Sequence, residues 1–498
     1  MRILPESLKR HFLALGGGLS AGAVLASLAA RTSPLVGSSV LLGGIAAIAV
    51  FAWPYLGFLL TAFAVPLERI GRLTNDSAMT TISLMRILGT LSLAAVLFQA
   101  VLRRRGLYTP KQFWLYAAYF CVQVVSILKV DSLKEGVRGA SAVLANVMFF
   151  LLVLNAVRSR LQVKMAVIAW LASTTLIGIF TVYQYHSDAA VTEDQHAATG
   201  MRTTDERFST VLHDSAEYEL LGNNVKRAIG STSNAAVYGI NLILALPFFF
   251  WLLRFEHRFW AVLLLLTAAA VVAYNALLTN TRAVMVTMLL SMGLCLAFKV
   301  AHFRREIWFG LLAGFVAIIP FIPAEIYQRA LTVSNYTASR SASLRYRFTY
   351  WEAAVDLISK NFWLGVGAGN QTILPKSVRN MYMPPNASAH NEYLNSLMEV
   401  GIFGYLLLIA FMISIWKTVR AGARRFALLG DAEAVLLMRC IMISFLSVLF
   451  FALQADVLHF PLKGWWLAIG LGIVLERMSR LALASSPGAT GDSQPVVS

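Results

Sequence analysis

Long apolar runs separated by short polar segments are the dominant pattern of this chain. They recur from the first twenty positions to residue 476, and at about 17 to 25 residues each can cross about 30 Å of hydrocarbon as a helix. The runs are continuous, whereas barrel strands alternate in and out, and a helix satisfies its own backbone hydrogen bonds in lipid. The sequence therefore predicts an all-α protein, a polytopic transmembrane helical bundle of about 12–14 spans.

A threading that starts with the N-terminus inside gives about fourteen spans. They are residues 12–30, 36–52, 54–66, 82–101, 112–128, 139–157, 165–185, 233–253, 259–276, 283–298, 307–323, 393–416, 435–453 and 464–476. Pro54 divides the apolar stretch 34–66, so the number of spans in that stretch stays open.

Clusters of Lys and Arg between the runs support this threading, because they all fall on the same side. The clusters are Arg103, Arg104 and Arg105; Arg158, Arg160 and Lys164; Arg254 and Arg258; Lys299, Arg304 and Arg305; Lys417, Arg420, Arg424 and Arg425; and Arg477 and Arg480. Cytoplasmic loops carry an excess of Lys and Arg. We therefore expect these clusters to be cytoplasmic.

Two polar segments, 186–232 and 324–392, are too long for simple connections, and the threading puts both outside the cytoplasm. We expect function to reside there, with short helices in the second loop. The predicted organisation is N-terminal transmembrane helices in 1–185, an outer loop in 186–232, central transmembrane helices in 233–323, a large outer loop in 324–392, C-terminal transmembrane helices in 393–484, and a disordered cytoplasmic tail in 485–498.

Composition excludes a soluble protein and changes how the net charge is interpreted. Of 498 residues, 58% are hydrophobic and 13% are charged, whereas about a quarter of a soluble domain is charged. A formal net charge of +17 raises the question of nucleic-acid binding. Because the basic residues lie in small clusters between apolar runs, we interpret them as topology signals and expect membrane lipids, not nucleic acid, as partners.

His390 begins a stretch in which the second outer loop runs into a span. An imidazole there can be partly desolvated and still reachable from the outer side, which suits a group that accepts a proton near neutral pH. The alternative is a histidine that caps a helix or packs at an interface. Glu399 falls deeper in the same predicted span, where an ionisable group indicates either function or pairing with a neighbouring helix.

Several arginines lie on the outer side, where they are not topology signals. Arg282 stands at the outer end of a span, and Arg347, with Trp351 four residues later, is predicted on a helix at the membrane surface. Arginine binds phosphate oxygens in a forked geometry and stays charged, so these residues are candidates to hold a lipid pyrophosphate. The alternative is contact with lipid headgroups. Further candidates for substrate binding are Arg86, Arg138 and Arg345.

The sequence has no Walker-type glycine loop, no metal-spaced cluster of His, Cys and carboxylates, and no Gly-x-Ser-x-Gly motif. Gly365 to Gly369 lack the strand, turn and helix context of a nucleotide site, and we interpret them as a turn. We therefore expect no ATP, no metal and no other cofactor.

Four stretches between about 225 and 415 carry a family resemblance. They are 230–234, leading into a span that ends at Leu246 and Pro247; 279–282; 347–351 continuing to 361–367; and 389–394 with Glu399, Val400, Gly401 and Gly404. Together they resemble the O-antigen ligase and Wzy-type polymerase superfamily of bacterial envelope glycan transferases. The last stretch is the most specific. The chain departs from the common pattern in Thr281, where a serine often precedes the arginine, and in extra N-terminal spans.

The resemblance implies transfer of a glycan from undecaprenyl pyrophosphate to a hydroxyl at the periplasmic face of the inner membrane, without metal or nucleotide. It makes both outer loops periplasmic and the second one catalytic. It implies that His390 activates the acceptor hydroxyl, that Arg282 and Arg347 hold the pyrophosphate, and that the anomeric carbon inverts. Asn391 and Glu399 join Arg86, Arg138 and Arg345 as expected substrate contacts.

The sub-branch stays open at this point. A ligase uses lipid A–core as acceptor, and a polymerase of O-antigen or exopolysaccharide uses another lipid-linked repeat unit, with a chain-length regulator as a further partner. Two more candidate functions are a protein O-oligosaccharyltransferase and a transporter or flippase of lipid-linked sugar. Transporters usually show matched half-repeats and polar residues at mid-membrane; neither is clear in this sequence, so catalysis is favoured.

Overall fold

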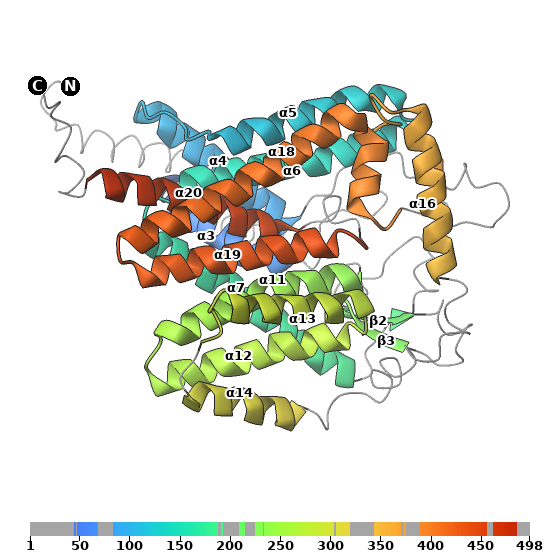
Figure 1. Ribbon diagram of the computed structural model, residues 1–498. Helices are drawn as coiled ribbons and strands as arrows, with labels where there is room; N and C mark the ends of the chain where they lie inside the picture. Colours follow the sequence, from blue (N-terminus) through green and yellow to red (C-terminus); the bar gives the residue numbers. More distant parts are fainter. Residues whose placement is uncertain are drawn as a thin grey trace, which may run out of the picture.

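The computed structural model describes residues 44–67 except 46, 83–187, 191–192, 209–214, 225–232, 234–302, 305–318, 343–369, 373–374, 389–455 and 462–485. This part of the chain is a bundle of helices that run side by side, with one helix, α16 (Ser343–Lys360), lying across one end of it (Figure 1). The predicted all-α transmembrane bundle is confirmed. The first predicted span, part of the second, and nearly all of the C-terminal tail lie outside the described residues.

The helices other than α16 follow the apolar runs closely. They are α3 (Pro54–Ala64), α4 (Leu84–Leu102), α5 (Lys111–Ser126), α6 (Leu133–Ala156), α7 (Arg160–His186), α11 (Ala235–Phe255), α12 (Phe259–Leu278), α13 (Arg282–Ala297), α14 (Arg305–Ile318), α18 (Glu392–Leu428), α19 (Ala432–Phe451) and α20 (Lys463–Ala484), with short 3₁₀ helices at Val65–Leu67 and Ile127–Lys129. In the described part, seven helices are long and apolar enough to cross a membrane, and Pro54–Leu67 and Arg282–Ala297 are shorter apolar helices.

Pro54 breaks the apolar stretch 34–66 where the sequence predicts a division. Trp53 is non-helical, with φ −128° and ψ 80°, and α3 begins at Pro54. Proline suits the first turn of a helix because its missing N–H has no intrahelical partner there. Residues 47–52 are helical before the break.

The basic clusters gather at one end of the bundle, which we call the basic end; Figure 1 shows it on the left. It contains loops 103–110, 157–159, 256–258, 298–302 and 429–431 and the C-terminal end of α20. Ion pairs join Arg160 to Asp431 and Arg425 to Glu476. Arg254 donates to the carbonyls of Lys299 and His302 at 3.1 and 2.8 Å. The predicted placement of these clusters on one side is therefore confirmed for the described residues.

The opposite end, the site end, carries α16 and a small sheet that the sequence analysis does not predict. Strand β2 (Val211–Asp214) pairs antiparallel with β3 (Val225–Ala228) and parallel with β1 (Val191–Thr192). Gln184 at the end of α7 ties this sheet to the bundle, since its side-chain oxygen accepts 2.7 Å hydrogen bonds from the backbone N–H and the hydroxyl of Thr210. The described part of the first outer loop thus packs against the bundle.

α18 is not one continuous span, which corrects the expectation for 393–416. Gly401 has φ 63° and ψ −171°, so a short helix, 392–400, ends there and a longer one begins at 402. We call residues 392–400 the site helix. Glycine adopts positive φ without the steric strain that a Cβ brings. Glu399 therefore lies in the last turn of the site helix and not deep in a span.

A second segment, residues 361–369, forms hydrogen bonds to the backbone on both sides of this break, and we call it the glycine loop. Its backbone N–H groups at Val366 and Gly367 donate to the carbonyls of Met398 and Glu399 at 2.9 and 3.0 Å, and Ile402 donates back to Phe362 at 2.8 Å. The carbonyls at the end of the site helix have no helical partner and find one here. Gly365 to Gly369 form turns, as the sequence predicts, but the turns serve as a structural clamp.

Close approach of the two backbones explains the glycines. A Cβ on Gly401 would lie 2.4 Å from the carbonyl oxygen of Trp363, and one on Gly365 would lie 2.3 Å from that of Glu399. Both residues have positive φ. Any side chain at either position therefore forces the glycine loop and the site helix apart.

We expect Gly401→Ala to destabilise the protein by about 3 kcal/mol, because it adds left-handed strain to a backbone clash. Differential scanning fluorimetry of the detergent-purified protein measures this as a lower unfolding temperature. Gly293→Ala is the matched control, since nothing lies within 4 Å of a Cβ at Gly293 in α13. An equal response of the two variants would contradict the clamp.

Candidate functional site

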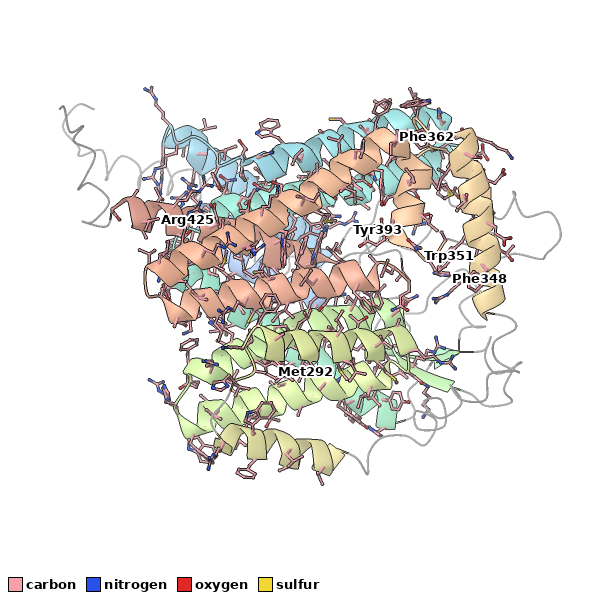
Figure 2. All side chains as sticks on the ribbon, viewed as in Figure 1. Met292, Phe348, Trp351, Phe362, Tyr393 and Arg425 are labelled. Atoms are coloured by element: carbon pink, nitrogen blue, oxygen red, sulfur yellow. The ribbon has the colours of Figure 1, made fainter. Side chains whose placement is uncertain are left out.

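α16 and the site helix pack against each other through a small apolar core of their own. Its buried residues are Tyr350, Ala354, Leu357, Val366, Leu374, Ala389 and Met398. The indole N–H of Trp351 donates to the carbonyl of Ala389 at 2.8 Å. In Figure 2, Trp351 lies between α16 and the site helix. This bond fixes the backbone immediately before His390.

The backbone at His390 turns sharply into the site helix. His390 has φ 48°, and histidine is among the few non-glycine residues that tolerate this region. Asn391 is the helix N-cap, and its side-chain oxygen accepts from the backbone N–H groups of Tyr393 and Leu394 at 3.0 and 3.2 Å. The structure thus gives Asn391 a capping role, and its substrate contact stays a prediction.

The site helix is also attached to the end of α19. The backbone N–H of Glu392 donates to the carbonyl of Ala452 at 2.9 Å, and the Tyr393 hydroxyl donates to that of Leu449 at 2.8 Å. The backbone at His390 is therefore held by α16 through Trp351, by α19 through these two bonds, and by the Asn391 cap of the site helix itself.

His390 and Arg347 lie close enough for the arginine charge to act on the imidazole. His390 is exposed to solvent. The protein packed near its ring nevertheless lowers its pKa by desolvation, and the charge of Arg347 lowers the pKa further. A lowered pKa keeps the ring neutral at pH 7, the form that accepts a proton. The structure therefore places two of the three predicted catalytic residues within electrostatic range of each other, and their catalytic roles stay predictions.

Arg282 is the third predicted catalytic residue, and it begins α13 at the site end. Its side chain is exposed. The turn that precedes it is tightly built: Asn280 is buried with φ 47°, and the Thr281 hydroxyl donates to the carbonyl of Thr279 at 2.9 Å. Among the described residues, no contact joins Arg282 to His390, so their meeting in one pocket stays a prediction.

The remaining predicted arginines are dispersed over the site end. Arg86 is half-buried in the first turn of α4, and its backbone N–H donates to the cap residue Ser83 at 3.3 Å. Arg138 is exposed in the second turn of α6, next to Gly139, which packs on Gly369 of the glycine loop. Arg345 lies in α16 and its side chain is outside the described residues. Their role in substrate binding stays a prediction.

Glu399 is buried, with 1% of its surface exposed. Its carboxylate accepts from the side-chain amide of Asn395 at 3.4 Å and lies within electrostatic range of Tyr119 in α5. This placement supports the alternative of pairing with a neighbouring helix.

Two further buried charges at the site end, Glu392 and Lys463, were not predicted from the sequence. Glu392 is 3% exposed and accepts from the Ser396 hydroxyl at 2.7 Å. At the start of α20, Lys463 is also 3% exposed and donates to Asn146 of α6. Buried charges need such partners. Two signals mark these residues in the sequence: Glu392 stands two positions after His390, and Lys463 lies at the outer end of a span, where the threading leaves no topology role for a lysine.

The fold and the site end define a multi-pass membrane protein with a histidine and an arginine within electrostatic range of each other at one end of a helix bundle. Residues 267–409 match the family model Wzy_C, described as O-antigen ligase, and this match supports membership of the chain in the O-antigen ligase family. The matched segment includes α13, α16, the glycine loop and the site helix. No curated protein matches the chain.

We expect Trp351→Phe to destabilise the protein by about 1 kcal/mol, since it removes one hydrogen bond and leaves the Ala389 carbonyl without that donor. Chemical unfolding followed by tryptophan fluorescence measures the difference. Trp260→Phe is the matched control, because Trp260 is 76% exposed and its replacement should change the free energy of unfolding by less than about 0.5 kcal/mol.

Proposed function

We propose that this protein is a membrane glycosyltransferase that moves a glycan from undecaprenyl pyrophosphate to an acceptor hydroxyl at the periplasmic face of the bacterial inner membrane. The family match supports the coarser statement of glycan transfer of the ligase or polymerase type in a membrane. The observation that carries the finer proposal is His390 beside Arg347, within the matched segment and at the end of the bundle opposite the basic clusters.

The orientation follows from the charge distribution. Basic loops remain in the cytoplasm, so the basic end faces inward and the site end faces the periplasm. A glycan attached to a carrier lipid in the outer leaflet then meets α16 and the site helix.

His390 is the proposed base. Its neutral ring takes the proton of the acceptor hydroxyl, and the oxygen forms a bond to the anomeric carbon of the donor sugar from the side opposite the pyrophosphate. The bond between that carbon and the pyrophosphate oxygen breaks, and the electron pair leaves with undecaprenyl pyrophosphate. The configuration inverts, and the imidazolium charge that forms is offset by the charge growing on the leaving group.

Arg347 and Arg282 are the proposed phosphate ligands. Both guanidinium groups retain their charge at any physiological pH and present a fork that matches phosphate oxygens. Arg282 additionally begins α13, and the first N–H groups of a helix with its dipole favour an anion at that place. The proposal requires no metal for this step.

The acceptor divides the proposal into two branches. Lipid A–core as acceptor makes the protein an O-antigen ligase, and a second lipid-linked repeat unit makes it a polymerase of O-antigen or exopolysaccharide, with a chain-length regulator as partner. Deleting the gene separates them: loss of polysaccharide-capped core with polymer still made indicates a ligase, and loss of long chains indicates a polymerase.

We expect His390→Ala to reduce glycan transfer by about 10²-fold or more, the usual contribution of a positioned base. Transfer from a lipid-pyrophosphate donor in proteoliposomes, with EDTA present, measures this. His257→Ala is the matched control, because His257 is exposed at the basic end. Near-normal transfer by the His390 variant, with the protein folded, removes His390 from the mechanism.

Arg347→Gln should also shift the pH profile. Removing its positive charge raises the pKa of His390, which the arginine now lowers. A protonated imidazole cannot act as base, so the acid limb of kcat/KM should move to higher pH by up to about 1 unit, in addition to an overall loss of rate. An acid limb that stays in place or moves to lower pH argues against the coupling.

A further inference from the structure

Four arginines at the basic end come together from three distant segments of the chain. Arg103 and Arg105 follow α4, Arg158 lies between α6 and α7, and Arg477 belongs to α20. Burial lowers the pKa of Arg158, and so do the charges of Arg105, Arg103 and Arg477. Arg158 therefore lies within electrostatic range of the other three, and four like charges share one small region.

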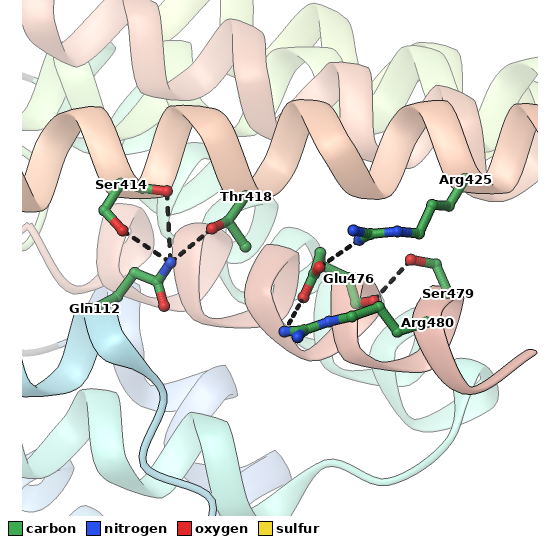
Figure 3. A network of polar contacts seen from close by, with 7 residues as sticks. All are labelled: Gln112, Ser414, Thr418, Arg425, Glu476, Ser479 and Arg480. Atoms are coloured by element: carbon green, nitrogen blue, oxygen red, sulfur yellow. Dashed lines mark hydrogen bonds and ion pairs between the residues drawn. The ribbon is translucent and has the colours of Figure 1, made fainter. Parts of the chain in front are cut away.

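Three carboxylates of the basic end, Glu476, Asp431 and Glu433, are already engaged by other cations. Glu476 binds Arg425 and Arg480, as Figure 3 shows. Asp431 binds Arg160, and Glu433 binds Lys164 at 2.9 Å. Within the described part of the chain, no ion pair with a carboxylate involves Arg103, Arg105, Arg158 or Arg477.

Local structure fixes the backbone from which Arg103 and Arg105 project. After α4, the N–H groups of Arg104 and Arg105 donate to the carbonyls of Val101 and Ala100 at 3.1 and 2.9 Å. This pattern, with Arg104 at φ 48°, is a Schellman cap. The cap fixes where Arg103 and Arg105 leave the helix.

A clamp from α6 fixes the chain that follows this cap. The side-chain oxygen of Asn155 accepts from the backbone N–H of Tyr108 at 2.7 Å, and its amide donates to the carbonyl of Tyr108 at 3.2 Å. The guanidinium carbon of Arg477 lies 4.3 Å from the centre of the Tyr108 ring. These contacts hold together the backbone of the α4–α5 loop, the end of α6 and the Arg477 side chain, so a single anion can meet several of the four positive charges.

We propose that Arg103, Arg105, Arg158 and Arg477, the arginine cluster, bind the phosphate of an anionic phospholipid. Guanidinium groups match phosphate oxygens in fork geometry. The site is distinct from the site end and does not depend on the proposed transfer reaction.

The surface beside the cluster favours a lipid over a soluble anion. Val101 and Leu102, the last residues of α4 before Arg103, are 77% and 62% exposed, and Leu481, one turn after Arg477, is 63% exposed. A phospholipid can contact the apolar side chains and the arginine cluster at once, because its acyl chains cover the former while its phosphate binds the latter. A free phosphate or an acidic peptide leaves the apolar side chains in water.

Native mass spectrometry of the detergent-purified full chain tests this, with phosphatidylglycerol and phosphatidylcholine titrated separately. Each arginine near a phosphate contributes about 1 kcal/mol, roughly fivefold in affinity. We expect Arg105→Gln combined with Arg158→Gln to weaken phosphatidylglycerol binding by roughly 25-fold. Binding of phosphatidylcholine should be weak and unchanged in every variant.

Arg424→Gln is the matched control: it removes the same charge from an exposed position in the basic part of α18, outside the cluster. Equal losses in the control and the double variant, or no loss in either, overturn the proposal. Inorganic phosphate that binds the wild type as tightly as the lipid overturns the choice of a phospholipid. If the double variant does not fold, the single variant Arg105→Gln, at an exposed position, should still lose about fivefold.

Discussion

The break of α18 at Gly401 is the constraint on which the site depends. A transmembrane helix cannot leave its terminal carbonyls without partners in a low-dielectric surrounding. The glycine loop supplies those partners at Met398 and Glu399, and it does so only because glycines with positive φ let the two backbones touch. Without this clamp, nothing would hold the end of the site helix at residue 400 or the change of chain direction at Gly401.

Once turned, the site helix presents its N-terminus to α16. Asn391 caps it and Trp351 holds the residue before His390, so the backbone that carries the imidazole is fixed. Arg347 in α16, a helix of the second outer loop, lies within electrostatic range of the imidazole. The fold thus joins an arginine and a histidine that lie 43 residues apart in sequence and gives the histidine the neutral form that a base requires.

Hydropathy alone predicted most of the bundle, because each span is a long apolar run, and charge alone predicted which loops share an end. The same signals could not predict the break at Gly401, since residues 400–404 continue the apolar pattern of the span. They could not predict the sheet near Thr210 either, because it depends on pairing between distant segments. His390 and Arg347 were recognisable from their motifs. Lys463 and Glu392 were missed because burial and partners belong to tertiary structure, and the place of Arg282 relative to His390 stays a prediction for the same reason.

The proposed mechanism rests most heavily on the prediction that His390, Arg347 and Arg282 line one pocket. Cryo-electron microscopy of the protein with a non-transferable lipid-pyrophosphate sugar bound tests it most directly. We predict density for the pyrophosphate within hydrogen-bonding distance of both guanidinium groups, with the anomeric carbon facing the imidazole across a space for one hydroxyl. Pyrophosphate bound at the basic end, or at the site end but out of reach of either arginine, would contradict the account.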